Sequence, residues 1–250
     1  MEPNFLSTDL TESACYLDLI EDGGLSPSLQ KALLRVGSSL QVKGLGAVLE
    51  GLPVCARVER KNRFSQVYVH ESQRMFSFDF WESGTMLGRG RTELLSDVAR
   101  AISDWLEMPA FLTELEGKYS FINVEEKTRS FENGREVDWT WDNYQTRLPK
   151  QFPTLSAFFD EAKQTPVLRR LFPFTSHNRF CFSRCTGYPY SADCPYIGPL
   201  DDGRYEVFDH TQRRIGVGIA KEAVTLVVEN LPANCGPAIR GTRDDLKTNK

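Results

Sequence analysis

Three successive segments of this chain alternate apolar and polar residues, and this pattern constrains the fold more than any other feature. The segments are enriched in β-branched and aromatic residues, are separated by polar turns, and span Val54–Arg60, Phe64–His70 and Met75–Trp81. A period of two is typical of strands that bury one face. Consecutive strands with short connections pair as neighbours in antiparallel fashion. The sequence therefore predicts a three-stranded antiparallel meander.

Amphipathic helices are expected before and after this meander in the sequence. Ser26 and Pro27 offer an N-cap and a proline at the first helical position, and apolar residues follow at helical spacing as far as about Val42. A second helix is expected after Thr92, a residue type favoured at N-caps. Its apolar face contains Leu95, Val98, Ile102 and Trp105.

The second half of the chain shows a similar order of elements. The expected elements are a helix over Thr154–Lys163, a strand over Arg179–Cys185, a hairpin of Tyr205–Asp209 and Arg214–Ile219, and a helix over Glu222–Leu231. A pair of glycines precedes the last helix of each half, Gly88 with Gly90 and Gly216 with Gly218. We therefore predict an α+β fold of two similar halves, each an antiparallel β-meander packed against amphipathic helices.

Changes in composition divide the chain into five segments. Residues 125–150 are rich in charge, contain Asn133-Gly134, and include Trp139 and Trp141 in surroundings that suggest exposure. This stretch is interpreted as a linker. The predicted segments are an acidic N-terminal arm (1–25), a first α+β half (26–124), a polar linker (125–150), a second α+β half (151–243) and a charged tail (244–250).

Composition and charge exclude several classes of protein. The chain has 250 residues, 40% of them hydrophobic and 26% charged, and a formal net charge of −4, so it has no overall positive field for nucleic acid. No stretch approaches the roughly 18 apolar residues of a membrane span, and the N-terminus does not read as a signal peptide. We expect a cytoplasmic protein with no nucleic-acid or membrane partner. Its six cysteines are then expected to stay reduced.

The stretch from Phe172 to Gly203 is the candidate site. A short aromatic strand leads there into a long loop rich in proline, tyrosine and glycine, and loops of such length in a compact domain are often functional. Arginine binds carboxylates and phosphates, and tyrosine offers rigid apolar area with a polar tip. The candidate binding residues are Arg179, Arg184, Tyr188, Tyr190 and Tyr196. Equally, the tyrosines could simply pack the loop onto the sheet.

The same stretch contains the candidate catalytic residues. His177 could act as a base for the thiol of Cys185 or of Cys194, although no local cysteine-protease signature accompanies them. A zinc site of His177, Cys181, Cys185 and Cys194 has the right residue types. On a strand, however, Cys181 and Cys185 would lie about 13 Å apart. We therefore expect no metal and no cofactor, and incomplete glycine motifs at Gly44 and Gly216 indicate tight turns instead of nucleotide binding.

Several motifs resemble those of a known bacterial family. They are Leu168–His177, Phe182–Cys185, Tyr188-Pro189, Leu231–Ala238 and, in the first half, Trp81, Gly84, Arg91-Thr92 and Trp105-Leu106. The chain resembles an uncharacterised family, a domain of unknown function, that is often encoded in natural-product biosynthesis loci. The resemblance extends over most of the chain after about residue 50. It implies a genomic setting and supplies no catalytic residue.

Two hypotheses of function follow. The first is an accessory or tailoring protein of natural-product biosynthesis that binds a small molecule or peptide at the Arg179–Tyr196 surface; the sequence names no reaction. The second is a non-catalytic protein of the immunity or scaffold type that binds a protein partner. The acidic arm, the tryptophans of the predicted linker and the lack of a complete catalytic motif favour the second.

Overall fold

The computed structural model describes residues 14–49, 52–70, 73–108, 110–233 and 235–248. The chain folds into two compact units. The first contains residues 1–82 and 86–128, and the second contains residues 83–85 and 129–250. The short segment 83–85 is the turn between two strands of the first unit, so the division does not follow the chain strictly.

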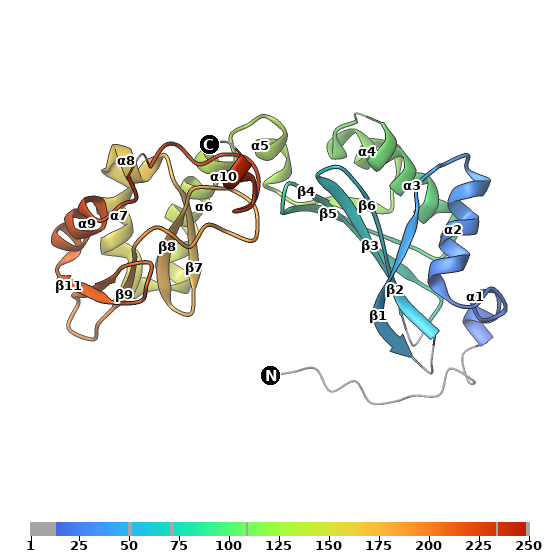
Figure 1. Ribbon diagram of the computed structural model, residues 1–250, viewed down its shortest axis with the longest axis horizontal. Coiled ribbons are helices and arrows are strands. Elements are labelled where there is room, and N and C mark those ends of the chain that lie inside the picture. Colours follow the sequence, from blue (N-terminus) through green and yellow to red (C-terminus); the bar gives the residue numbers. More distant parts are fainter. Residues whose placement is uncertain (1–13, 50–51, 71–72, 109, 234, 249–250) are drawn as a thin grey trace. The chain divides into compact units, whose positions relative to one another are not determined.

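The first unit is built on a six-stranded antiparallel meander in which each strand pairs with the next in sequence. Its strands are β1 (Val42–Leu49), β2 (Leu52–Arg60), β3 (Arg63–Val69), β4 (Phe76–Glu82), β5 (Thr85–Thr92) and β6 (Ile122–Val124). Figure 1 shows helices of this unit beside the sheet. These helices are η2 (Ala14–Tyr16), α1 (Leu17–Glu21), α2 (Leu25–Arg35), α3 (Leu95–Glu107) and α4 (Leu112–Lys118).

The core of the first unit lies between the sheet and helices α2 and α3. Phe78 and Phe80 of β4 are buried, and the ring of Phe80 meets the indole of Trp105 edge-on at 5.8 Å. Leu29 and Leu33 of α2 are fully buried. Alternate residues of β4 therefore bury one face of the sheet, as the alternating pattern predicts.

The second unit contains a five-stranded antiparallel sheet, again in sequential order. Its strands are β7 (Phe172–Ser176), β8 (Arg179–Ser183), β9 (Tyr196–Pro199), β10 (Tyr205–Phe208) and β11 (Arg214–Gly218). Its helices are α5 (Thr128–Glu132, which begins at the boundary between the units), α6 (Glu136–Gln151), η3 (Pro153–Leu155), α7 (Ser156–Gln164), α8 (Pro166–Arg169), α9 (Ala220–Glu229) and α10 (Asp245–Thr248). The predicted α+β class, with two antiparallel sheets and packed helices, is confirmed.

Aromatic rings fill the core between this sheet and its helices. Phe180 and Phe182 of β8 are buried against Phe158 and Phe159 of α7, and Trp141 of α6 contacts the same rings. Helix α9 closes the core from the β10–β11 side. Its buried residues are Ala223, Val224 and Val227, which lie on the face of α9 that packs against this core.

Residues 238–243 form a segment that we call the C-terminal strap. It contacts the residues just before β7 and the loop just after β8. The backbone N–H of Ala238 donates to the carbonyl of Arg170 at 2.9 Å, and that of Ile239 donates to the carbonyl of Arg184 at 2.9 Å. Ile239 also forms a parallel bridge with Cys185. The strap thus supplies hydrogen-bond donors to the carbonyls of Arg170 and Arg184.

Three expectations need correction. The predicted polar linker is largely helix, because residues 136–151 form α6, and the expectation that Trp141 is exposed is wrong since its side chain is fully buried. The helix expected to reach Val42 ends at Arg35. Gly37, with φ of 81°, ends it, because the N–H of Ser38 bonds back to the carbonyl of Leu33. Residues 1–13 of the predicted acidic arm lie outside the described residues.

The second glycine of the first pair and the first glycine of the second pair have a common physical role. A side-chain carbon at Gly90 would lie 2.2 Å from the ring of Phe78, and one at Gly216 would lie 2.5 Å from Leu226 of α9. Both glycines therefore make room for large apolar side chains. Each pair lies in the last long strand before a helix, β5 before α3 and β11 before α9, as the sequence suggests.

Within the described residues, no helix combines the length and the apolar character that crossing a membrane demands.

Candidate functional site

His177 lies in the two-residue turn of the β7–β8 hairpin. His177 and Asn178 have φ values of 49° and 59°, the left-handed conformations that a type I′ turn requires. The His177 side chain is exposed, and its Nδ1 lies 3.0 Å from the hydroxyl of Ser176. The position is therefore a hairpin tip with local contacts.

Cys185 lies just beyond the opposite end of β8 and is fully buried. Its N–H donates to the hydroxyl of Ser183 at 3.1 Å, and that hydroxyl donates to the Cys185 carbonyl at 2.7 Å. Burial is the main cause that raises the pKa of the Cys185 thiol. Because the length of β8, roughly 15 to 20 Å, separates His177 from this thiol, the structure does not bring the expected Cys/His pair together.

The four residues with zinc-ligand types are also dispersed. Cys181 lies within β8 and Cys185 lies after it, while His177 occupies the hairpin tip. Across the described ranges, no three histidine, cysteine or acidic side chains gather in a way that could hold a metal ion.

The second sheet has an open face, which we define by Phe174, Arg179, Cys181, Tyr196 and Phe208. Residues that alternate with these along the strands, Phe180, Ile197 and Val207, are fully buried on the helix side. The cross-strand partners Phe174 with Cys181 and Tyr196 with Phe208 confirm that these side chains share the other face. Arg179 is exposed and the other four are half-buried.

Arg179 is held over two aromatic rings of the open face. Its guanidinium carbon lies 5.0 Å from the Tyr196 ring centroid and 5.7 Å from that of Phe208, and these two rings stack at 5.2 Å. Nη1 of Arg179 also donates to the Tyr196 hydroxyl at 3.4 Å. Among the described residues, no carboxylate forms an ion pair with Arg179.

The first sheet offers an instructive contrast. Arg57 lies 3.7 Å above the Phe64 ring, on the face of that sheet away from α2 and α3. There, however, Glu59 neutralises the arginine through a 2.7 Å ion pair. An arginine over an aromatic ring thus occurs on both sheets, and among the described residues only the one on the second sheet lacks an ion pair with a carboxylate.

Tyr190 and Tyr188 extend the open face along the loop after β8. The Tyr190 ring packs 4.6 Å from Phe174 and 5.5 Å from Phe172, and burial raises the pKa of its hydroxyl to about 12. Tyr188 meets Tyr190 edge-on at 5.9 Å and is 68% exposed. Tyr190 therefore fastens the loop to the sheet, whereas Tyr188 offers an accessible ring.

Arg184 does not belong to the open face. Its Nε and Nη2 donate to one carboxylate oxygen of Asp193 at 2.9 and 2.7 Å, and its N–H donates to the hydroxyl of Ser191. These bonds close the loop between β8 and β9. Of the five predicted binding residues, the structure therefore gathers Arg179, Tyr188, Tyr190 and Tyr196 along one surface and assigns Arg184 to the loop itself.

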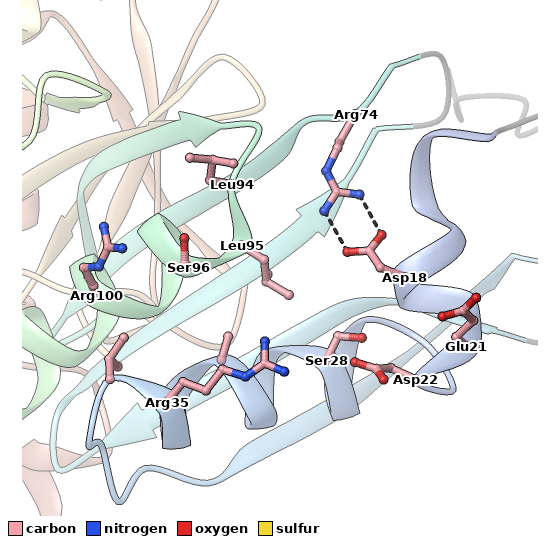
Figure 2. Close-up of a pocket in the computed structure, with 12 residues that line it drawn as sticks. Asp18, Glu21, Asp22, Ser28, Arg35, Arg74, Leu94, Leu95, Ser96 and Arg100 are labelled. Carbon is pink, nitrogen blue, oxygen red and sulfur yellow. Dashed lines mark hydrogen bonds and ion pairs between the residues drawn. The ribbon is translucent and has the colours of Figure 1, made fainter.

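The first unit contains a pocket of about 830 Å³ between α1, α2 and the start of α3 (Figure 2). In Figure 2, Asp18 of α1 lies against Arg74 of the segment before β4, while Arg35 of α2 and Arg100 of α3 lie farther along the hollow. The charged residues that line it are Asp18, Glu21, Asp22, Arg35, Arg74 and Arg100. Leu94 and Leu95 supply apolar lining on the α3 side.

Most charges of this pocket are already paired. The guanidinium of Arg74 donates to both carboxylate oxygens of Asp18 at 2.8 Å, and this hydrogen bonding lowers the pKa of Asp18. Lys31, 2.5 Å from Asp22, likewise lowers the pKa of that carboxyl. Within the described part of the chain, Arg35 has no ion-pair partner, and Figure 2 shows its side chain extending from α2, which lines the pocket.

The sequence does not reveal this pocket, because residues 1–25 read as an acidic arm. Asp18 and Arg74 are 56 residues apart, and no local spacing links them. The helix over Ala14–Glu21 that positions Asp18 is too short to produce a clear periodic pattern. The one available signal is Tyr16, an aromatic residue within the acidic stretch that is buried against Phe76.

Comparisons with known proteins give one match. No curated protein and no solved structure matches this chain. Residues 135–242 match a family of unknown function, DUF6193. The matched region runs from the start of α6 to the C-terminal strap and includes the open face, but it covers less than half of the chain. Most of the second unit is therefore similar to the domain that this family describes, whose function is unknown.

Proposed function

We propose that this chain is a binding protein whose open face holds an extended peptide with an acidic group, as an accessory component of natural-product biosynthesis. The observation that carries the proposal is Arg179, a charged guanidinium fixed over two aromatic rings with no carboxylate partner among the described residues. The biosynthetic setting is supported by the sequence resemblance alone.

The surroundings of Arg179 explain the choice of ligand. A guanidinium offers a planar fork for a carboxylate, and stacking on aromatic rings limits the side-chain entropy that binding would otherwise cost. Half-buried rings at Tyr196, Phe208 and Phe174 supply rigid apolar area on either side. Tyr188 adds an exposed ring beyond Tyr190. An extended chain along this row would meet the Arg179 guanidinium between the rings of Tyr196 and Phe208 on one side and that of Phe174 on the other.

The proposal is tested with short synthetic peptides on the full chain. Each peptide carries an aromatic residue and an aspartate or glutamate, and its control has asparagine or glutamine instead. We expect calorimetry to show tighter binding of the acidic peptides, and Arg179→Gln to abolish that preference. Arg213→Gln is the matched control, because Arg213 is an exposed arginine of the same unit that is paired with Asp209. Equal binding of acidic and amide peptides would refute the site.

The rival hypothesis is a stable protein partner on the same face. Purification from the native host distinguishes the two, since a stoichiometric folded partner would favour a scaffold role and a bound peptide or metabolite would favour the accessory role. In both cases Arg179→Gln should release the bound component. Retention of a partner by that variant would move the interface away from the open face.

A second candidate is a small acidic molecule in the pocket of the first unit. Arg35 favours it, because this arginine lines a concave site and has no ion pair within the described residues. Citrate and inorganic phosphate are suitable probes. Thermal stabilisation by either probe that disappears in Arg35→Gln and persists in Arg179→Gln would support this pocket as the ligand site.

A further inference from the structure

Two thiols of the second unit lie in direct contact. Cys194 is buried in the loop before β9, and Cys235 is half-buried in the segment between α9 and the C-terminal strap. Both pack against the same aromatic core. Their side chains are hydrogen-bonded to each other, although 41 residues separate them in sequence. Neither residue lies in a helix or a strand.

The contact has a defined electrostatic setting. The guanidinium of Arg184 acts on both thiols, and Asp193 fixes its position through bonds of 2.7 and 2.9 Å. The hydrogen bond from Cys194, followed by the charge of Arg184, lowers the pKa of Cys235 against the opposing effect of burial. The same hydrogen bond and burial raise the pKa of Cys194. Cys235 is also the more exposed thiol of the pair, so a small disulfide reaches it before the buried Cys194.

The other cysteines differ from this pair. Burial raises the pKa of Cys55 and Cys185, and it raises that of Cys181 to about 12, so these thiols remain protonated near neutral pH. Cys15 is exposed. A reactive thiol with a second thiol in contact is the arrangement that redox-sensitive sites use.

We propose that Cys194 and Cys235 form a reversible disulfide in exchange with small-molecule disulfides. The Cys235 thiolate attacks one sulfur of the small disulfide, whose S–S bond breaks and releases one thiol. Cys194 then loses its proton to solvent and attacks Cys235, which forms the internal disulfide and releases the second thiol. Two electrons pass from the two protein thiols to the small disulfide, which is reduced to two thiols.

The positions of the two cysteines give the proposed Cys194–Cys235 disulfide a structural consequence. Cys194 lies in the loop that Arg184 and Asp193 close, and Cys235 lies three residues before Ala238, where the C-terminal strap begins. A disulfide would tie the strap to this loop covalently, beside the hydrogen bonds that join them in the reduced protein. Oxidation is therefore expected to raise the melting temperature of the second unit.

The test equilibrates the reduced full chain with mixtures of oxidised and reduced glutathione, followed by acid quenching, alkylation and peptide mapping. We expect a Cys194–Cys235 peptide that is lighter by about 2 Da than its two reduced parts and that reverts on reduction. Cys194→Ser should instead accumulate a glutathione adduct on Cys235, because the second attack is lost. Cys15→Ser, the control, should leave the internal bond unchanged.

A second measurement does not depend on removing either cysteine. Arg184→Gln removes the charge that favours the Cys235 thiolate, so the reaction with oxidised glutathione at neutral pH should slow about three- to tenfold. An unchanged rate would exclude Arg184 from the site. Absence of the internal bond in the wild-type chain at every glutathione ratio, or links that form only through Cys15, would overturn the proposal.

Discussion

The indole of Trp141 donates a 3.0 Å hydrogen bond to the carbonyl of Leu171, and this bond joins helix α6 to the residue before β7. The donor and acceptor are both buried, and the ring also contacts Phe159, Phe180 and Phe182. A segment with the composition of a linker thus supplies the central side chain of the second core.

Replacement of Trp141 should therefore destabilise the protein. Trp141→Phe leaves the Leu171 carbonyl without its donor and removes part of a filled volume, which should lower the free energy of unfolding by about 2 to 4 kcal/mol. Trp139→Phe is the control, because Trp139 is only half-buried. Urea unfolding of both variants provides the measurement, and equal losses would contradict the assigned role of Trp141.

Helix α9 gives a graded series of substitutions. Val227 is fully buried, Val228 is half-buried and Glu229 is exposed. Val227→Ala should cost about 2 kcal/mol, through lost burial of two methyl groups and a residual cavity. Val228→Ala should cost less, and Glu229→Ala almost nothing. A different order in their melting temperatures would show that another face of α9 meets the sheet.

Two glycines should respond to alanine in opposite directions. At Gly90 the added carbon would overlap the Phe78 ring, so Gly90→Ala should destabilise the first unit by about 1 to 3 kcal/mol. Gly117 lies in α4 and has nothing within 4 Å of the added carbon. Gly117→Ala should stabilise by about 0.5 to 1 kcal/mol, because glycine is a poor helix former. Chemical denaturation can measure both changes.

The Asp18–Arg74 pair should make stability depend on pH in acid. Arg74 lowers the pKa of Asp18 in the folded chain, so the pair contributes fully above the unfolded pKa and is lost as pH falls through the lower folded value. Asp18→Asn should therefore lower the melting temperature near about pH 7, and the difference from wild type should shrink towards about pH 3.

Asp201→Asn, in an exposed turn of the second unit, should leave the melting temperature unchanged across the same range. A difference between Asp18→Asn and wild type that stays constant from neutral to acidic pH would show that the Asp18 carboxylate contributes nothing through Arg74.

Local patterns predicted much of the fold. The alternation in β2, β3 and β4 and the apolar spacing of α3, α7 and α9 are properties of short segments, and the structure contains all of these elements. Strand β1 was missed because Gly44 and Gly46 resemble turn residues, although both lie within the strand. Trp141 was misjudged because its partners, Phe159, Phe180 and Phe182, come from segments that composition alone cannot place beside it.

The candidate site was predicted in part for the same reason. Arg179 and Tyr196 come together because β8 pairs with the next strand in sequence, β9, and Tyr190 packs on Phe174 of the neighbouring β7. The pairing of Arg184 with Asp193 removes it from the surface, and a sequence gives no indication of which way an arginine in a loop turns. The contact of Cys194 with Cys235 depends on the return of the chain after α9, and no spacing rule anticipates it.

The C-terminal strap limits the order in which this protein can fold during its synthesis. The carbonyls of Arg170, Arg184 and Pro189 accept hydrogen bonds from Ala238, Ile239 and Arg243, residues made about fifty to seventy positions later. Until the ribosome has added those residues, the carbonyls of Arg170, Arg184 and Pro189 lack these hydrogen-bond donors. The second unit therefore completes these hydrogen bonds only after residue 243 has been synthesised, whereas the strands described for the first unit end at residue 124.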